Sequence, residues 1–329
     1  MNRLHTATLL ASVLLLAPTG CLTLDSFIYN PIHCSNVGPD TCEEKGEEWD
    51  RACVPCDEEY DWTRTYDWIE GTLDNEVTSV RPVETAIQDL VIPTDDGLAE
   101  LDAVFLPSHG EFPELAQTTI LYNHGRYASI EHYMPRVRFL HEAGYNVFIW
   151  DYRGYGKSMP EGAPNTEQYL ADAHTARAFA EGVAPDPDKI IVYANSLGGI
   201  PAVEMSATDT PPCALFLEAA FTSMSEVSAS NSGTGFPESF FSANEFDVSA
   251  ELEGYRGATL VMTGNEDNFF PFQDQFETYD AVVGPKRLWI VDGAKHGLSN
   301  GGIPEAGLGP YFIQMREFLV QYAPECLTR

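Results

Sequence analysis

A serine, an aspartate and a histidine each follow an apolar run in this sequence. Together these residue types can carry out nucleophilic catalysis. Ser196 follows the run 190–192, and Asp267 and His296 each lie five residues beyond the end of a later apolar run. A serine hydroxyl is a poor nucleophile until a base removes its proton. His296 would supply that base and later protonate the leaving group, while Asp267 would orient the imidazole and stabilise the cation that forms. The set therefore predicts that Ser196 acts as an activated nucleophile.

The residues around Ser196 suit a tight turn between a strand and a helix. The segment 193–199 reads YANSLGG, and a helix-like segment, 200–205, follows it. A serine held in a strained backbone conformation needs small residues two places before it and two places after it. Ala194 and Gly198 meet that requirement, so we expect a strand–turn–helix unit that pushes the serine hydroxyl out above a sheet.

The negative charge that develops on a carbonyl oxygen during attack needs two backbone N–H donors. The N–H of Leu197, directly after the serine, is one candidate. The second should come from the loop after the apolar run that ends at Tyr122, and we choose Arg126 N–H because Gly125 lets that loop turn in. His124, in the same loop, is expected to brace the loop rather than to act as a base.

Other carboxylates compete for the role assigned to Asp267. Glu218 ends an apolar run and Glu266 is the immediate neighbour of Asp267, so either could take its place as the catalytic acid. Asp151 and Asp292 each follow a strand-like run, and we expect them to fix turns through local hydrogen bonds.

From about residue 79 onwards, strand-like apolar runs alternate with helix-like segments. The expected strands are 89–93, 101–106, 118–122, 145–150, 190–193, 214–217, 259–262 and 288–291, and the expected helices are 133–143, 167–181, 200–205 and 311–322. This alternation predicts an α/β fold, in which a mostly parallel sheet is covered by helices on both faces and a first hairpin adds an antiparallel edge. Catalytic groups of such a fold gather at the carboxyl ends of the strands, where Ser196, Asp267 and His296 all fall.

Six short motifs form a set that is far more specific than the serine turn alone. They are Asn123-His124-Gly125, the segment 151–158 (DYRGYGKS), the turn around Ser196, Phe221-Thr222-Ser223, Gly264-x-x-Asp267 and Asp292-Gly293-Ala294-x-His296. The set resembles the BEM46/ABHD-type serine hydrolases, and the likeness covers roughly residues 79–329. The chain order Ser, Asp, His also matches that of the α/β-hydrolase superfamily, to which they belong. The resemblance implies the α/β-hydrolase fold and hydrolysis through an acyl-enzyme, without a metal or an organic cofactor.

The first twenty residues are predicted to be an export signal. Arg3 precedes an apolar run at 9–17 that is too short to span a bilayer, and small residues then lead up to Cys21. This pattern resembles a bacterial lipoprotein signal, in which the cysteine is lipidated and becomes the first residue of the mature chain. An ordinary signal peptide, with Cys21 in a disulfide, is the alternative.

The chain is therefore expected to have three parts. Residues 1–20 are a signal peptide, and residues 21–78 are a lipid-anchored tether and cysteine-containing segment. Residues 79–329 are a hydrolase domain with a cap insertion at about 219–252.

The seven cysteines fit an oxidising compartment. With Cys21 lipidated, an even number remains. Those near the N-terminus are candidates for disulfides of undetermined pairing: Cys34, Cys42, Cys53 and Cys56. Half of a zinc site at Cys53 and Cys56 is the alternative. Cys213 precedes a strand, and Cys326 follows a terminal helix that should run back to the same edge of the sheet, so we predict a bridge between them.

Phenylalanine side chains are expected to supply the substrate pocket. Those that could line an acyl pocket are Phe236, Phe240, Phe241, Phe269 and Phe270. The alternative for the same side chains is that they pack the cap onto the body of the domain.

The formal net charge of −32 restricts the partners of this protein. It argues against nucleic acid binding, because phosphate neutralisation needs Lys and Arg.

The sequence thus predicts a serine hydrolase of the bacterial cell envelope, exported to the periplasmic side or the cell surface and held at a membrane by its lipid anchor. Its substrate would be an acyl or other small-molecule ester or thioester. A peptidase or amidase with the same three residues is one alternative, and a catalytically silent binding protein is the other. The oligomeric state is left open.

Overall fold

The computed structural model describes residues 29, 31, 33, 87–126, 129–220, 248–270, 272, 274–297, 302–303 and 307–328. The predicted signal peptide and most of the predicted tether and cap lie outside the described residues. So do several residues singled out from the sequence: Cys21, Cys34, Cys42, Cys53, Cys56, Phe236, Phe240 and Phe241.

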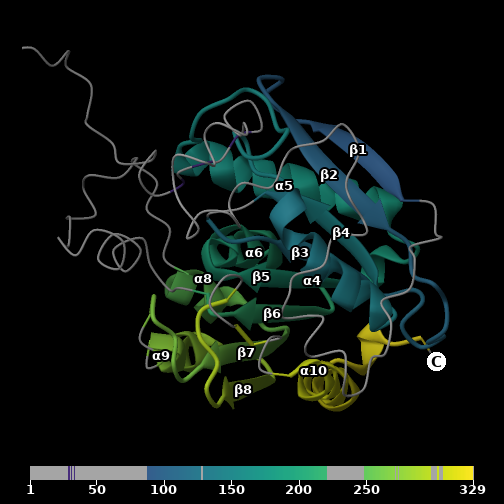
Figure 1. Ribbon diagram of the computed structural model, residues 1–329, viewed down its shortest axis with the longest axis vertical. Coiled ribbons are helices and arrows are strands. Elements are labelled where there is room, and N and C mark those ends of the chain that lie inside the picture. The colour runs from purple at the N-terminus through teal and green to yellow at the C-terminus, as the bar shows by residue number, and fades with distance from the viewer. Residues whose placement is uncertain are drawn as a thin grey trace, which may run out of the picture.

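An eight-stranded sheet forms the centre of the described chain, with the strand order β1-β2-β4-β3-β5-β6-β7-β8 (Figure 1). The strands are β1 (Gln88–Pro93), β2 (Glu100–Leu106), β3 (Thr119–Asn123), β4 (Asn146–Trp150), β5 (Ile190–Asn195), β6 (Ala214–Glu218), β7 (Ala258–Gly264) and β8 (Lys286–Val291). β2 runs antiparallel to both of its neighbours, whereas every pair from β4 to β8 is parallel. The predicted fold, a mostly parallel sheet with an antiparallel hairpin at one edge, is confirmed.

Helices cover both faces of this sheet. They are α4 (Ile130–Glu142), α5 (Thr166–Val183), α6 (Gly199–Ser206), α8 (Val248–Gly254), α9 (Asp274–Ala281) and α10 (Leu308–Tyr322). Side chains of α5, α6 and α8 belong to the apolar core on one face, and those of α4 and α10 to the core on the other (Figure 1). The sequence predicts neither α8 nor α9, because helices of seven and eight residues are too short to show a clear helical period. α6 is equally short, but the turn around Ser196 marks its start.

The side chains of β5 show how a central strand serves both faces. Ile190, Val192 and Ala194 belong to the core beneath α5 and α6, while Ile191 and Tyr193 belong to the core beneath α4 and α10. Every residue of β5 is buried. A strand covered on both faces needs apolar side chains at successive positions, and this explains the uninterrupted apolar run that precedes Ser196.

Polar residues determine where α4 and α5 begin. Asn165 caps α5, since its side chain accepts the N–H of Gln168 at 2.8 Å and the Gln168 side chain accepts the N–H of Asn165 at 3.1 Å. α4 begins at Ile130, directly after Ser129. The start predicted from the sequence, residue 133, is three residues too late, because the polar first turn of α4 hides the apolar period.

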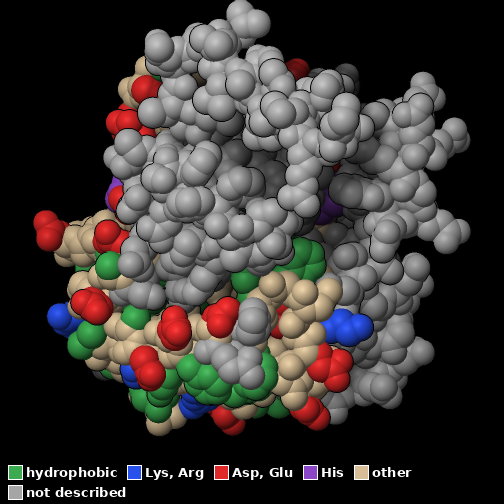
Figure 2. Space-filling view, turned by 90° about the vertical axis from the view of Figure 1, so that its left-hand side faces the viewer, with side chains coloured by type: hydrophobic (Ala, Val, Ile, Leu, Met, Phe, Trp, Pro, Cys, Tyr) green, Lys and Arg blue, Asp and Glu red, His purple; other side chains and the backbone are tan. Residues whose placement is uncertain are grey.

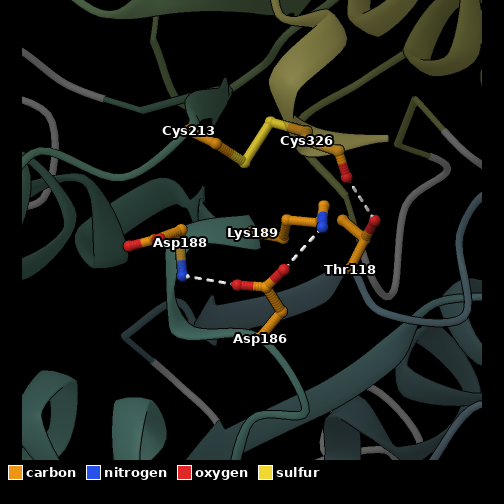
Figure 3. The surroundings of a disulfide bond; sticks show 6 residues. All are labelled: Thr118, Asp186, Asp188, Lys189, Cys213 and Cys326. Atoms are coloured by element: carbon orange, nitrogen blue, oxygen red, sulfur yellow. Dashed lines mark hydrogen bonds and ion pairs between the residues drawn. A yellow bond between two sulfur atoms is a disulfide. The ribbon is translucent and has the colours of Figure 1, made fainter. Parts of the chain in front are cut away.

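A disulfide joins Cys213 and Cys326, as the sequence analysis predicts (Figure 3). Cys213 directly precedes β6, and Cys326 ends a short 3-10 turn, Pro324–Cys326, that follows α10. The hydroxyl of Thr118, just before β3, donates to the carbonyl oxygen of Cys326 at 2.5 Å. The bridge therefore fastens the C-terminal segment to the amino-terminal edge of the parallel strands, opposite the edge where Ser196 lies.

Acidic side chains are scattered over one described face of the molecule. Figure 2 shows Asp and Glu scattered over the described part of the face that carries α8 and α9. They are interspersed there with hydrophobic side chains and fewer Lys and Arg. The large negative charge of the chain is therefore not confined to one binding patch on this face, which agrees with a solvated acidic surface.

The double substitution Cys213→Ala with Cys326→Ala is expected to lower the free energy of unfolding. The bridge closes a loop with a sequence separation of 113. For a loop of roughly that length, chain entropy contributes about 4–5 kcal/mol. Urea unfolding of the variant beside the wild type measures the loss, and equal unfolding free energies would contradict the prediction.

Candidate active site

Ser196 stands at the end of β5, where the chain turns sharply towards α6. Its φ is +52°, and among the described residues other than glycine only Ser196 and Ala219 have a positive φ. Such a conformation costs a residue with a side chain about 1–3 kcal/mol, so the surrounding turn must hold it. Glycine is required at 198, because a Cβ there would overlap the carbonyl oxygen of Asn123.

His296 bridges Ser196 and Asp267. Its Nε2 lies 2.9 Å from Ser196 Oγ, and its Nδ1 lies 2.9 Å from Asp267 Oδ2. The three residues follow β5, β7 and β8, and the last two loops are joined where the side-chain amide of Asn265 donates to Asp292 at 2.7 Å. When Nδ1–H donates to Asp267, Nε2 presents a lone pair to the serine hydroxyl. This is the arrangement that a general base requires.

Asp267 is held so that one carboxylate oxygen faces His296. Its Oδ1 accepts the backbone N–H groups of Phe269 at 2.8 Å and Phe270 at 2.9 Å, and this leaves Oδ2 for the imidazole. The Asp267 side chain is only 1% exposed. Water therefore competes little for the carboxylate, and its orientation is determined by the loop after β7.

The two alternative carboxylates have other surroundings. Glu218 is fully buried, and it accepts hydrogen bonds from Arg136 Nη1 at 2.6 Å and from the hydroxyl of Tyr193. Glu266 is exposed to solvent. The carboxylate that the structure brings to His296 is that of Asp267.

Phe269 and Phe270 pack against the imidazole of His296. Their ring centroids lie 4.8 and 5.3 Å from that of the imidazole. Phe269 is 38% exposed, whereas Phe270 is buried. The two predicted pocket residues that the structure describes therefore form an apolar wall beside the base.

The loop after β3 lies directly beside the serine. A Cβ built on Gly125 would be 3.3 Å from the Cβ of Ser196 and 3.2 Å from Oδ1 of Asn195. Arg126, the next residue, and Leu197 are both buried. The structure thus places both predicted oxyanion donors, Leu197 N–H and Arg126 N–H, in segments that adjoin Ser196.

His124 and Asp151 form a buried pair behind this loop. Nδ1 of His124 lies 2.8 Å from the carbonyl oxygen of Gly125, and Nε2 lies 3.1 Å from Asp151 Oδ1. Asp151 Oδ1 also accepts the N–H of Ile130, the first residue of α4. The expectation that His124 braces the loop agrees with these contacts. Asp151, by contrast, acts over a longer range than the predicted local turn, because it ties the end of β4 to α4 and to the loop after β3.

Burial changes the protonation of this pair. It lowers the pKa of His124 from 6.5 to about 4, and it raises the pKa of the Asp151 carboxyl well above its usual range. Both shifts disfavour charge in an apolar setting. The shifts favour a protonated Asp151 carboxyl beside a neutral His124 imidazole in the folded protein.

Two polar residues of α4 contact the site without having been singled out by any sequence pattern. Tyr133 and Arg136 are both buried, and they lie three residues apart on one helix face. Tyr133 bonds to Asn195, the residue before the serine, and Arg136 bonds to Glu218. The one available signal is an arginine on the face that carries the core residues Tyr133 and Leu140, three residues before it and four after it.

The described part of the chain offers little else that could bind a ligand near Ser196. No group of three or more His, Cys, Asp or Glu side chains gathers there that could hold a metal ion. No described helix is long and apolar enough to cross a membrane. A groove of about 590 Å³ lies beside Cys213, lined by Arg177, Pro211 and Arg256 among others. It lies at the edge of the sheet opposite Ser196 and plays no part in this site.

Three comparisons with known proteins place the chain among hydrolases. Residues 115–240 match the family model described as "Serine aminopeptidase, S33". An uncharacterized protein of Mycobacterium tuberculosis is 30% identical over 223 residues, which are 67% of this chain and 76% of the relative. Protein bem46 of Schizosaccharomyces pombe is 36% identical over 126 residues, 37% of this chain and 41% of the relative.

A solved structure shares the fold. The esterase Pf2001 of Pyrococcus furiosus superposes with a TM-score of 0.60 at 20% sequence identity, over 73% of this chain and 93% of the esterase.

The substitution Asp151→Asn is expected to change how stability depends on pH. Between about pH 4 and pH 6.5 each state holds one proton on these two residues. In the folded protein it is on Asp151, and in the unfolded chain it is on His124. Above about pH 6.5 the unfolded chain holds none. Up to the raised pKa of the Asp151 carboxyl, folding therefore takes up a proton, and the stability from this pair falls as pH rises, by up to about 1.4 kcal/mol per pH unit. Asparagine cannot take up that proton.

The free energy of unfolding lost through Asp151→Asn should therefore be smaller at about pH 8 than at about pH 6. Urea unfolding of both proteins at the two pH values measures the loss, and charges elsewhere cancel in the comparison. A loss that is the same at both pH values would show that the pair does not retain its proton.

Proposed function

This chain belongs to the BEM46-like α/β hydrolases, and we propose that it is a serine hydrolase that cleaves an ester or thioester through Ser196, His296 and Asp267. The observation that carries the proposal is the imidazole of His296, which lies 2.9 Å from both the serine hydroxyl and the carboxylate. A binding protein has no need of a base placed between a strained serine and a buried acid.

The proposed reaction has two halves. His296 Nε2 removes the proton of Ser196 as Oγ attacks the substrate carbonyl carbon, and the carbonyl oxygen becomes an oxyanion that the N–H groups of Leu197 and Arg126 stabilise. The imidazolium, stabilised by Asp267, gives its proton to the leaving oxygen or sulfur as that bond breaks. In the second half, the same imidazole removes a proton from water as the water oxygen attacks the acyl-serine carbonyl. That proton passes to Ser196 Oγ as the acyl–oxygen bond breaks and the acid leaves.

The surroundings of the base support an ester or thioester substrate. Phe269 and Phe270 lie against the imidazole, so the groups next to the leaving atom are apolar. The buried carboxylates Asp267 and Glu218 are engaged by His296 and by Arg136. Neither is therefore free to bind the ammonium group of a peptide N-terminus, which an aminopeptidase must recognise.

A peptidase or amidase is the second candidate. The matching family model carries the description of a serine aminopeptidase, and the acidic surface of this chain would attract a cationic peptide. Side-by-side assays of acyl esters and aminoacyl amides distinguish the two enzymes. A catalytically silent binding protein would hydrolyse neither.

We also propose that a lipid on Cys21 holds the enzyme at a membrane. Eight positions separate Cys21 from Tyr29, a span of at most about 29 Å. The hydroxyl of Tyr29 lies 2.9 Å from Thr166 Oγ1, and its carbonyl oxygen accepts the hydroxyl of Tyr155. The ring of Tyr155 lies 5.5 Å from that of His124, in the loop beside Ser196. A lipidated chain would therefore keep the active site close to acyl substrates in the bilayer.

Ser196→Ala is expected to abolish hydrolysis and labelling by a fluorophosphonate probe, with the fold intact because the lost atom is small. His296→Ala should be nearly as severe, since the three residues act as a unit. Asp267→Asn should lower kcat by roughly 10³ to 10⁴-fold, because asparagine favours the wrong imidazole tautomer. Glu266→Gln is the matched control, one position away and exposed, and should retain wild-type kcat. Near wild-type turnover in Ser196→Ala would disprove the assignment.

Cys21→Ser is expected to move the protein from the detergent phase to the aqueous phase of a Triton X-114 separation. The apolar run before residue 21 is removed with the signal peptide, so the lipid alone would hold the mature chain. Soluble-ester hydrolysis should be unchanged in the variant, which serves as the control for folding. Recovery of the wild type in the aqueous phase would refute the anchor.

A further inference from the structure

One phenolic hydroxyl links two segments of the active site. Tyr133, on α4, is buried, and its oxygen accepts the N–H of Gly125 at 2.9 Å. The same hydroxyl donates to Oδ1 of Asn195 at 3.1 Å. Gly125 immediately precedes Arg126, and Asn195 immediately precedes Ser196. The hydroxyl thus joins the loop that carries a proposed oxyanion donor to the turn that carries the nucleophile.

A buried ion pair supports Asn195 from the other side. The Nδ2 group of Asn195 lies 3.4 Å from Glu218 Oε1, which also accepts from Arg136 Nη1 at 2.6 Å. The second oxygen of Glu218 accepts the hydroxyl of Tyr193, whose oxygen lies 2.7 Å from that of Tyr311. A carboxylate engaged by so many donors has little freedom to move, so it fixes the orientation of the Asn195 amide.

The same arginine reaches the histidine loop. Nη2 of Arg136 lies 3.0 Å from the place that a Cβ would occupy on Gly297, the residue after His296. Tyr133 and Arg136 lie on one face of α4, so a single helix contacts the segments that hold the nucleophile, the base and a proposed oxyanion donor.

We propose that Tyr133 is a positioning residue, which holds the Arg126 N–H at the correct distance from the carbonyl carbon that Ser196 attacks. The proposal rests on the serine hydrolase function proposed above and adds a residue to it. Tyr133 would touch neither the substrate nor the reacting atoms, and would act through Gly125 and Asn195.

The predicted effect is specific to the transition state. An oxyanion donor must lie about 2.7–3.1 Å from the oxygen that becomes charged, and a displacement of about 1 Å in an active site can lower the rate by roughly 100-fold. Loss of the Tyr133 hydroxyl leaves the Gly125 N–H without its partner oxygen and frees the loop to shift. Binding of the uncharged substrate depends much less on that distance, so kcat should fall while KM stays constant.

The test compares Tyr133→Phe with Tyr145→Phe. Tyr145 is an equally buried phenol before β4, at the opposite edge of the sheet, so its variant controls for the loss of a buried hydroxyl. We expect Tyr133→Phe to lower kcat roughly tenfold at constant KM. Its affinity for a trifluoromethyl ketone with the acyl chain of the assay ester should fall in proportion, because that inhibitor forms the charged tetrahedral adduct. Tyr145→Phe should match the wild type in all three quantities.

A double-mutant cycle tests whether the effect passes through Asn195. Asn195→Ala removes the acceptor of the Tyr133 hydroxyl but leaves the Gly125 N–H bonded. If the two residues act through one link, the double variant should lose much less than the product of the two single losses. Should Tyr133→Phe not fold at the assay temperature, Asn195→Ala carries the test, with the same fall in kcat at constant KM expected.

The outcomes separate this proposal from the function on which it rests. Wild-type kcat in Tyr133→Phe, or a rise in KM with unchanged kcat, would overturn the positioning role and leave the hydrolase function standing. A wild-type enzyme that neither turns over esters nor labels at Ser196 would overturn both.

Discussion

The left-handed backbone at Ser196 is the constraint on which the rest of the site depends. A single residue with φ of +52° turns the chain from β5 towards α6, and this turn leaves the serine hydroxyl beyond the end of the sheet. β5 can bear the strain because it is paired on both sides, with β3 and β6. Gly198 allows the turn to approach the backbone at Asn123. With the serine fixed by the backbone, the loops after β7 and β8 need only deliver Asp267 and His296 to one point.

A polar layer lies beneath this point, inside an otherwise apolar core. Arg136 and Glu218 are both buried, and a buried ion pair often contributes little net stability because desolvation of the charges offsets their attraction. Its effect here is geometric, since each partner also contacts a segment of the active site. His124 and Asp151 do the same behind the loop after β3, where burial favours the uncharged form of each group. Polar contacts thus fix relative positions that apolar packing alone would leave adjustable.

The three residues of the proposed triad were predictable because the proposed chemistry requires particular residue types directly after strands, and the strands are visible as apolar runs. Ser196 is the clearest case, with small neighbours that only a strained turn requires. The supporting residues were not predictable in the same way. Tyr133 and Glu218 have partners at distant positions in the chain, and no local pattern reports such a pairing. Asp151 shows the same limit, since its residue type indicates a local turn, whereas its partner is His124.

The disulfide has a consequence for the integrity of the chain. Asp267 and His296 both lie between Cys213 and Cys326 in the sequence, whereas Ser196 lies outside that interval. A single peptide bond cut anywhere inside it, in the cap for example, divides the chain into one piece with the nucleophile and another that carries at least the C-terminal cysteine. The sulfur–sulfur bond keeps those pieces in one molecule. A protein nicked by a protease in an oxidising compartment would thus retain all three residues of the proposed triad, and would separate into fragments only when the bridge is reduced.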